Sequence, residues 1–469
     1  MPSTQAPRHL PGLSPAALIG GYFLLGILPL IIAWFGDAGD QPILRALSGG
    51  LVMVAFSLML VQFVLSGRFE RVSGKVGIDV TMRFHQLAAW IVLGFIVAHP
   101  LLYPLARLPD NPAGAWAMLV GMVSSTGLRT GVVAWVLLIV LVVMAIFRDR
   151  LGVGYEAWRL SHGVGAVAIA VLALDHTLAV GTHSGSGLLA WYWMAMTAVA
   201  VGSVLFVYGV KPVIKARRPY RVVSNRRIAD RTWEVVVEPE HADGRIPVHA
   251  PGQFAWLNLG HKPYSLTEHP FSIATPPSAL PRIGFAIKES GDFTSRIGEI
   301  ATGTRAFLDG PHGSFTTTGR DRPVDGRAPE GAAQSADSAG LVMIAGGVGL
   351  APMAGILAHL VDTNYPLPVH LIYGNRLESQ IMYRDRLEQA AAVLDMRVDL
   401  VLSEPPEGWT GKVGNLTPDV LRACLPDALP RDTLYLVCGP AMMMTVVEDA
   451  LVGMGVPGDR IVAERFKYD

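Results

Sequence analysis

The sequence predicts a multidomain membrane protein, built from a six-helix transmembrane bundle, an antiparallel β-barrel domain and an α/β domain with a parallel sheet. Three observations predict this fold class. Long apolar runs with few charges dominate up to about residue 210. Short strand-like runs separated by Gly, Pro, Asn and Asp follow as far as about residue 315, and strand and helix patterns alternate after residue 340.

Length and composition exclude several classes of protein. A chain of 469 residues suits about three domains of roughly 150 residues each. The formal net charge of zero shows no basic excess, so we expect no nucleic-acid partner. The two cysteines are too few to hold an iron–sulfur cluster, and they also exclude a disulfide framework and a cysteine-ligated zinc site.

Six segments of the first half are long enough to cross about 30 Å of hydrocarbon at about 1.5 Å of rise per residue. We interpret the first as a spanning helix and not as a signal peptide, because Arg8 is the one fixed positive charge before it and similar segments follow. The predicted spans cover residues 16–35, 46–66, 84–105, 131–147, 160–181 and 187–208.

The distribution of positive charge orients this bundle. An even number of spans puts both ends on one side, and the positive-inside rule makes the more basic side cytoplasmic. The opposite side holds only Arg45, Arg107 and Arg129, whereas the connections after the second, fourth and sixth spans carry most of the basic residues. We therefore expect the segment 1–14 and the soluble half to be cytoplasmic.

Two histidine pairs occur in the third and fifth spans. His85 and His99 are 14 residues apart, and so are His162 and His176. On a helix this spacing comes within about 40° of whole turns and covers about 21 Å, so both imidazoles of a pair face the same way. The two spans run parallel, which sets His85 level with His162 and His99 level with His176.

Ionisable residues at membrane depth are costly and usually functional, and neutral imidazole is a natural axial ligand of haem iron. The repeated spacing therefore predicts two stacked bis-histidine b-type haems. The alternative for any single histidine is an interhelical hydrogen bond.

Two motifs in the strand-rich region suit a flavin nucleotide. The predicted strands cover 220–223, 232–238, 253–257 and 283–288. His269-Pro270-Phe271-Ser272 offers an aromatic ring, a hydroxyl and a cation-capable ring. In segment 288–295, glycine allows close backbone approach, and hydroxyls with helix-start amides can hold a pyrophosphate. Each motif alone is more often a loop, and residues 310–313 predict a turn.

The last part of the chain predicts a parallel sheet with helices on both faces. Strands are expected over 341–345, 369–373, 397–402 and 433–437, with helices from about 352, over 384–393 and from 441. The glycine-rich segment 346–352 follows the first strand, where free amides can receive a dinucleotide pyrophosphate. Cys438-Gly439-Pro440 follows a later strand at the same edge, and a buried structural thiol is the alternative for Cys438.

Taken together, these motifs resemble the ferric reductase and NADPH oxidase superfamily in its prokaryotic form, in which a six-helix, two-haem cytochrome is fused to a ferredoxin-reductase-like module. The resemblance covers residues 16–469. It implies a transmembrane haem domain over 15–210, an FAD-binding β-barrel over 211–315, a flexible linker over 316–340 and an NAD(P)H-binding α/β domain over 341–469. It also implies a multi-pass protein of the bacterial inner membrane, in contact with lipid.

The resemblance assigns roles to individual residues. It implies that the haem iron ligands are His85, His99, His162 and His176. Around the FAD it places His269, Pro270, Phe271, Ser272, Lys288, Gly291, Thr294 and Ser295. Around the nicotinamide dinucleotide it places Gly346, Gly347, Gly349, Pro352, Cys438, Gly439 and Pro440. Phe466 is expected to cover the flavin, with Tyr468 as the alternative, and the implied catalytic residues are Ser272, Cys438 and Phe466.

The implied activity is electron transfer from cytoplasmic NADPH or NADH, through FAD and two b-type haems, to an external acceptor such as ferric iron. Two alternatives stay open: an oxidase that reduces O2 to superoxide, and a membrane haem-binding or sensing protein without enzymatic activity. Oxygen-reducing members carry a basic residue on the second helix and a histidine one turn past the outer ligand. Here Arg45 matches the basic residue loosely, whereas Tyr103 stands in the turn where the histidine is expected, which weighs against superoxide production.

The preferred nicotinamide and the oligomeric state are left open. Arg376 follows a predicted strand and could contact a 2′-phosphate, which would favour NADPH. The alternative is an exposed arginine without a ligand.

Overall fold

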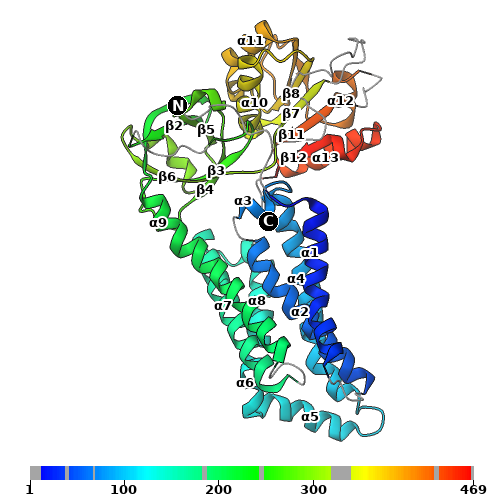
Figure 1. Cartoon of the computed structure of the whole chain (residues 1–469). Helices are drawn as coiled ribbons and strands as arrows, with labels where there is room; N and C mark the ends of the chain where they lie inside the picture. Colours follow the sequence, from blue (N-terminus) through cyan, green and yellow to red (C-terminus); the bar gives the residue numbers. More distant parts are fainter. Residues whose placement is uncertain are drawn as a thin grey trace. The chain divides into compact units, whose positions relative to one another are not determined.

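The computed structural model describes residues 12–36, 42–66, 69–181, 187–241, 248–317, 340–426 and 432–465, apart from the side chains of Asp79 and Asp149. The chain divides into two compact units, one from Gly12 to Pro212 and one from Val213 onward. The first is a helical bundle, and the second contains two β-sheets (Figure 1).

Among the described residues of the first unit, six helices are long and apolar enough to cross a membrane, which confirms the predicted multi-pass fold. Their apolar side chains face outward, as the large exposed fractions of Trp34 (83%) and Trp191 (69%) show, and lipid is the solvent that suits such a surface. The six helices are α1 (Pro15–Phe35), α2 (Ile43–Leu65), α4 (Ile78–Leu105), α6 (Arg129–Ile146), α7 (Tyr155–Val180) and α8 (Gly187–Leu205).

Small polar side chains lie inside the bundle, where helices approach closely. Ser57 is fully buried, and its hydroxyl donates to the Leu25 carbonyl oxygen of α1 at 2.6 Å. α2 packs against α1, α4 and α8, whereas α7 packs mainly against α6. The two histidine-bearing helices, α4 and α7, therefore belong to different helix pairs.

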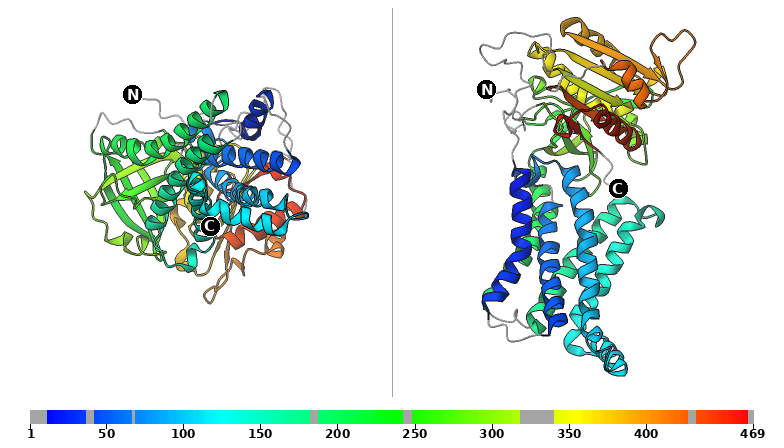
Figure 2. Two further views of the ribbon diagram at one scale, coloured as in Figure 1. Left: turned by 90° about the horizontal axis from the view of Figure 1, so that it is seen from below. Right: turned by 90° about the vertical axis from the view of Figure 1, so that its right-hand side faces the viewer.

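Shorter helices connect or extend the spanning helices. They are α3 (Glu70–Ser73), α5 (Pro112–Ser124) and α9 (Lys211–Ala216), and a π-helical turn over Phe206–Val210 joins α8 to α9. The sequence patterns did not predict α5, which starts at a proline and is capped by Asn111 through a 2.8 Å hydrogen bond to Gly114 N. Its 13 residues reach about 20 Å, too short to span. It lies at the end of the bundle where α4 ends and α6 begins (Figure 2).

The first sheet is antiparallel, and its strand order is β4-β3-β6-β1-β2-β5. It curls, because Ile273, just after β4, forms a bridge to Phe285 in β5. The predicted turn over 310–313 is wrong, since strand β6 continues through His312. The strands are β1 (Tyr220–Ala229), β2 (Thr232–Pro239), β3 (Phe254–Leu259), β4 (His269–Ser272), β5 (Ile283–Lys288) and β6 (Arg305–His312).

The second sheet is parallel, in the order β10-β9-β8-β7-β11-β12. Alternate residues of β7 enter two separate cores: Met343 packs with α10 and α11 on one face, and Ile344 packs with α12 and α13 on the other. The strands are β7 (Leu341–Gly346), β8 (Val369–Asn375), β9 (Met396–Leu402), β10 (Lys412–Val413), β11 (Leu434–Cys438) and β12 (Ile461–Ala463). The helices are α10 (Leu350–Asp362), α11 (Arg384–Val393), α12 (Pro418–Cys424) and α13 (Ala441–Gly453).

A buried carboxylate joins the curled sheet to the parallel-sheet domain. Glu234 of β2 is 4% exposed. It accepts a 2.9 Å hydrogen bond from the Tyr383 hydroxyl and pairs at 2.8 Å with both Arg226 and Arg386. Burial opposes ionisation of Glu234, but these donors outweigh it and hold its pKa below the usual value of 4.5.

The Glu234 cluster gives a stability prediction. We expect Glu234→Gln to destabilise the soluble half by about 1–3 kcal/mol, because the buried Tyr383 hydroxyl and the exposed Arg226 and Arg386 lose a charged acceptor. The contribution of a carboxylate with a lowered pKa is complete above pH 4.5 and is lost as the pH falls through the folded-state value. Urea unfolding of the full chain, followed by tryptophan fluorescence, should therefore show a wild-type advantage that shrinks in acid.

Glu238→Gln is the matched control, because Glu238 lies on the same strand but forms ion pairs with the exposed Arg221 and Arg282. We expect little change from it. Equal unfolding midpoints for the two variants would contradict the role given to Glu234.

Candidate functional site

The structure brings the histidines of α4 and α7 together in the predicted pairs. The imidazole ring centroids of His85 and His162 are 6.4 Å apart. Two metal–nitrogen bonds of about 2 Å, together with two ring radii of about 1.1 Å, give a separation of about 6.2 Å for imidazoles that share one metal ion. The pair therefore fits a single iron between its rings. His99 and His176 each lie 14 residues further along the same two helices, which puts them at a common second level.

Paired imidazoles supply two ligands, and an iron ion prefers more. No group of three or more His, Cys, Asp or Glu side chains suited to a metal ion occurs among the residues that the structure describes. A bare ion would thus lack ligands, whereas a porphyrin brings its own nitrogens and needs only axial imidazoles. The donor set fits haem.

The α7 imidazoles are held by packing. The His162 ring stacks on the Trp158 indole, with a centroid distance of 5.3 Å, and the Arg148 guanidinium lies 5.0 Å from the centre of that indole. The His176 ring lies directly against Gly131 of α6, where a Cβ atom would come within 2.5 Å of His176 Cε1 and 2.7 Å of Cγ. Neighbouring groups thus fix both ring positions.

The predicted flavin motif lies on strand β4. Phe293, which the sequence patterns did not single out, stacks on His269 at 4.5 Å and lies 6.5 Å from Phe271. Ser272 is buried and pairs with Phe254 of β3. These side chains form an aromatic surface at the end of the sheet that borders segment 288–295.

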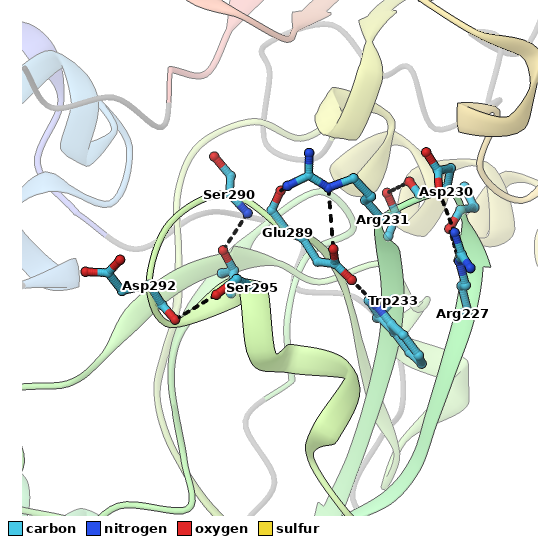
Figure 3. A network of polar contacts seen from close by, with 11 residues as sticks. Arg227, Asp230, Arg231, Trp233, Glu289, Ser290, Asp292 and Ser295 are labelled. Carbon is cyan, nitrogen blue, oxygen red and sulfur yellow. Dashed lines mark hydrogen bonds and ion pairs between the residues drawn. The ribbon is translucent and has the colours of Figure 1, made fainter.

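Hydrogen bonds within segment 288–295, and one from Trp233 of β2, stabilise the conformation of this segment (Figure 3). Trp233 Nε1 donates to Glu289 Oε1 at 2.8 Å, and the backbone N–H of Ser290 donates to Thr294 Oγ1 at 2.8 Å. Gly291 has a φ of +102°, a conformation that other residues rarely adopt. The predicted phosphate-binding loop therefore has a defined shape at the start of the 3₁₀ helix Thr294–Glu299.

The glycine-rich loop of the α/β domain lies at the carboxyl end of β7. Gly347 has a φ of +54°, and its carbonyl oxygen accepts a 3.1 Å hydrogen bond from the Tyr373 hydroxyl. A Cβ atom on Gly347 would lie 3.9 Å from Lys288 Nζ, so this lysine of the curled sheet reaches the loop. A Cβ atom on Gly349 would lie 2.8 Å from Gly439 N. The two predicted nucleotide-binding segments are therefore in contact.

Cys438 ends β11 beside these glycines and is fully buried. Burial, reinforced by the negative charge of Glu464, raises the pKa of its thiol, which stays neutral. Glu464 is 4% exposed and follows β12, and a Cβ atom on Gly313 would lie 2.6 Å from its Oε1 atom. Sequence patterns missed this carboxylate because only the folding of β12 beside β11 brings it to Cys438.

Phe466 and Tyr468 lie outside the described residues, as does most of the proposed linker 316–340. Arg376 follows β8 at the same sheet edge, is 61% exposed and lies 3.9 Å from Glu404. Its role and those of the other predicted site residues stay predictions.

The packing of His176 against Gly131 gives a direct test. We expect Gly131→Ala to displace the His176 ring, because the new methyl group would occupy its place. Haem content, measured on the purified full chain as the pyridine haemochrome, should fall toward one haem per chain. Gly202→Ala in α8, where a Cβ atom meets nothing within 4 Å, is the control. Two tightly bound haems with an unchanged spectrum in G131A would contradict the placement of His176.

Two family models match separate parts of the chain. Residues 51–173 match the model described as "Ferric reductase like transmembrane component", and residues 343–449 match "Oxidoreductase NAD-binding domain". The first range contains His85, His99 and His162 and ends three residues before His176. The second range contains both glycine segments of the nucleotide site.

Several reductases are similar to part of this chain. NADH-cytochrome b5 reductase 1 of Ajellomyces capsulatus is 42% identical over 120 residues, which cover 24% of this chain and 38% of that protein. The reductase component of propane 2-monooxygenase from Mycolicibacterium goodii is 32% identical over 226 residues, covering 46% and 58%. The chain spans 38–58% of the length of the cytochrome b5 reductases and of the monooxygenase reductase component that it matches. The solved Amycolatopsis cytochrome P450 reductase GcoB is 22% identical, with a TM-score of 0.44, and the match covers 54% of this chain and 70% of that one.

The order of the two matched models along the chain confirms the fused architecture that the sequence motifs predict. A ferric-reductase-like membrane component comes first, and an NAD-binding reductase domain follows a curled antiparallel sheet. The chain thus joins a ferric-reductase-like transmembrane component to an NAD-binding oxidoreductase domain, which matches the fused architecture of the ferric reductase and NADPH oxidase superfamily.

Proposed function

We propose that this protein moves electrons from cytoplasmic NADPH or NADH, through FAD and two b-type haems, to an external acceptor such as ferric iron. The observation that carries the proposal is the 6.4 Å separation of His85 and His162, on two helices of the ferric-reductase-like component. That distance suits two axial ligands of one iron. The matching 14-residue spacing of both pairs supports a second haem at the other level.

The proposed cofactors divide the chemistry. FAD, when bound, accepts a hydride and returns single electrons, and each haem iron carries one electron at a time. The domain boundaries proposed for these groups are 15–210 for the haems, 211–315 for FAD and 341–469 for the nicotinamide dinucleotide. The side chains and backbone of this chain would bind and orient these cofactors.

In the proposed nucleotide site, backbone amides and side chains of this chain would hold the pyrophosphate, the nicotinamide ring and the flavin. The glycines of segment 346–349 let backbone amides approach a pyrophosphate, and Lys288 adds a positive charge beside them. Cys438 presents a neutral thiol, because burial raises its pKa, so it adds no charge next to a nicotinamide ring. Ser272, buried at the end of β4, is placed to donate a hydrogen bond to the flavin edge, and Phe466 is proposed to cover the flavin face.

The charge bias of the helix connections supports a bundle whose soluble half is cytoplasmic. We accordingly propose a location in the bacterial inner membrane, with His85 and His162 at the cytoplasmic level and His99 and His176 at the external level. Electrons would then enter at the first pair and leave at the second.

The surroundings of His99 favour a reductase over an oxidase. Tyr103 lies one turn beyond His99, and its ring meets the imidazole edge-on at 5.7 Å. A bulky aromatic residue therefore occupies the place where oxygen-reducing members are expected to carry a histidine. Ferric iron or another small oxidant is accordingly our first candidate for the acceptor.

Anaerobic stopped-flow spectroscopy of the full chain loaded with FAD and haem tests this function. We expect NADPH or NADH to reduce the haem absorption bands without any added protein, and ferric chelate to reoxidise them. The faster of the two donors identifies the preferred nicotinamide and shows whether Arg376 selects for a 2′-phosphate.

Failure of both donors to reduce the haem bands, with FAD and haem bound, would contradict the proposal. Added oxygen separates the alternatives. Dye reduction that is sensitive to superoxide dismutase would establish the oxidase and overturn the reductase assignment.

A further inference from the structure

Helix α2 contacts both imidazoles of α4. His99 Nδ1 lies 2.8 Å from Ser48 Oγ and 3.2 Å from the Ser48 carbonyl oxygen. The Ser48 hydroxyl in turn donates to the His99 carbonyl oxygen at 2.9 Å. A carbonyl oxygen can only accept, so the proton of His99 is on Nδ1. This leaves the Nε2 lone pair available for a metal.

His85 has a corresponding partner. Its Nδ1 atom lies 3.2 Å from Gln62 Oε1, and Gln62 Nε2 donates to the Tyr22 hydroxyl at 2.9 Å. With its amide nitrogen engaged by Tyr22, Gln62 turns its acceptor oxygen toward His85. The imidazole proton is again on Nδ1, and Nε2 is again available.

The spacing on α2 matches the spacing on α4. Ser48 and Gln62 are 14 residues apart, as are His85 and His99. α2 and α4 are neighbouring helices that run in opposite directions. Ser48 therefore lies level with His99, and Gln62 lies level with His85. One helix face of α2 thus serves both levels.

The α7 imidazoles lack such partners. Nδ1 of His162 and Nδ1 of His176 are buried and have no hydrogen-bond partner among the residues that the structure describes. They are positioned by Trp158 and Gly131 instead. Each pair consequently combines one hydrogen-bonded imidazole from α4 with one imidazole held by packing from α7.

We infer that Gln62 and Ser48 are positioning residues that fix the proton of the α4 imidazoles and set the reduction potentials of the two haems separately. This inference rests on the proposed function. A hydrogen bond from Nδ1–H to an acceptor raises the basicity of the ligand nitrogen. A more basic ligand stabilises the ferric state over the ferrous state and so lowers the reduction potential. Loss of the acceptor raises it.

A matched pair of serine variants tests the external level. Ser48 and Ser57 both lie on α2 and are both fully buried, but Ser57 bonds to Leu25 and Tyr192 and to no histidine. In potentiometric titrations of the purified holoprotein, we expect Ser48→Ala to raise the midpoint potential of one haem and leave the other unchanged. Ser57→Ala should leave both unchanged. Equal effects of the two variants would overturn the inference for Ser48.

Two Gln62 variants test the cytoplasmic level, because they should shift the haem reduction potential in opposite directions. Gln62→Leu removes the acceptor, and Gln62→Glu replaces it by a carboxylate, which accepts more strongly. We expect Q62L to raise, and Q62E to lower, the potential of the haem that Ser48→Ala leaves unchanged. Each variant should change the oxidation–reduction equilibrium of that haem about tenfold, which is a shift in midpoint potential of about 59 mV for one electron.

A general disturbance of packing would move Q62L and Q62E in the same direction, and that result would overturn the inference. Haem content, measured on each sample, keeps the two proposals apart. Two haems per chain whose midpoint potentials do not change in the Ser48 and Gln62 variants would refute only the positioning role. A wild-type protein without haem would refute the proposed function.

Discussion

Four imidazoles placed at two depths of an apolar bundle are the constraint on which the rest of this structure depends. Inside a membrane, water is absent, so each ring nitrogen must find a partner within the protein or in a ligand. The histidines of α4 and those of α7 are held in different ways. Helix α2 satisfies Nδ1 of His85 and His99, and stacking or close backbone approach fixes the rings of His162 and His176. For His85 and His99 these contacts leave Nε2 available to the proposed haem iron.

In the soluble half, close contacts at glycines bring the predicted nucleotide-binding segments together. Close approach of Gly349 to Gly439 brings two loops from different strands together, and Lys288 reaches them from the curled sheet. Glu234 ties that sheet to α11. A nucleotide bound at the glycine-rich loop would thus lie beside residues of both sheets, which is the arrangement that hydride transfer between two cofactors requires.

Patterns that repeat along the chain were predictable from sequence. The spans and the histidine pairs follow from helical periodicity, and the glycine and cysteine segments follow from their place after buried strands. The β6 strand was missed because Gly310-Pro311 is typical of a turn. Helix α5 was missed because its apolar run is too short for a span.

Partners set by tertiary packing were not predictable. Gln62 and Ser48 are ordinary polar residues of an apolar helix until α2 packs on α4, and nothing near Gly131 in the sequence points to His176. Phe293 and Glu464 likewise acquire their neighbours only when distant strands pair. Periodicity therefore predicted the candidate ligands, whereas the residues that contact them came from the structure.

The central claim is that the four histidines act as two pairs, each holding one haem. Haem stoichiometry in histidine-to-leucine variants of the full chain measures this directly. The account predicts two haems per chain in the wild type, and one in the double variant His85→Leu/His162→Leu, because both changes strike the same pair. It predicts none in His85→Leu/His99→Leu. One haem in the second double variant, or none in the first, would contradict the pairing.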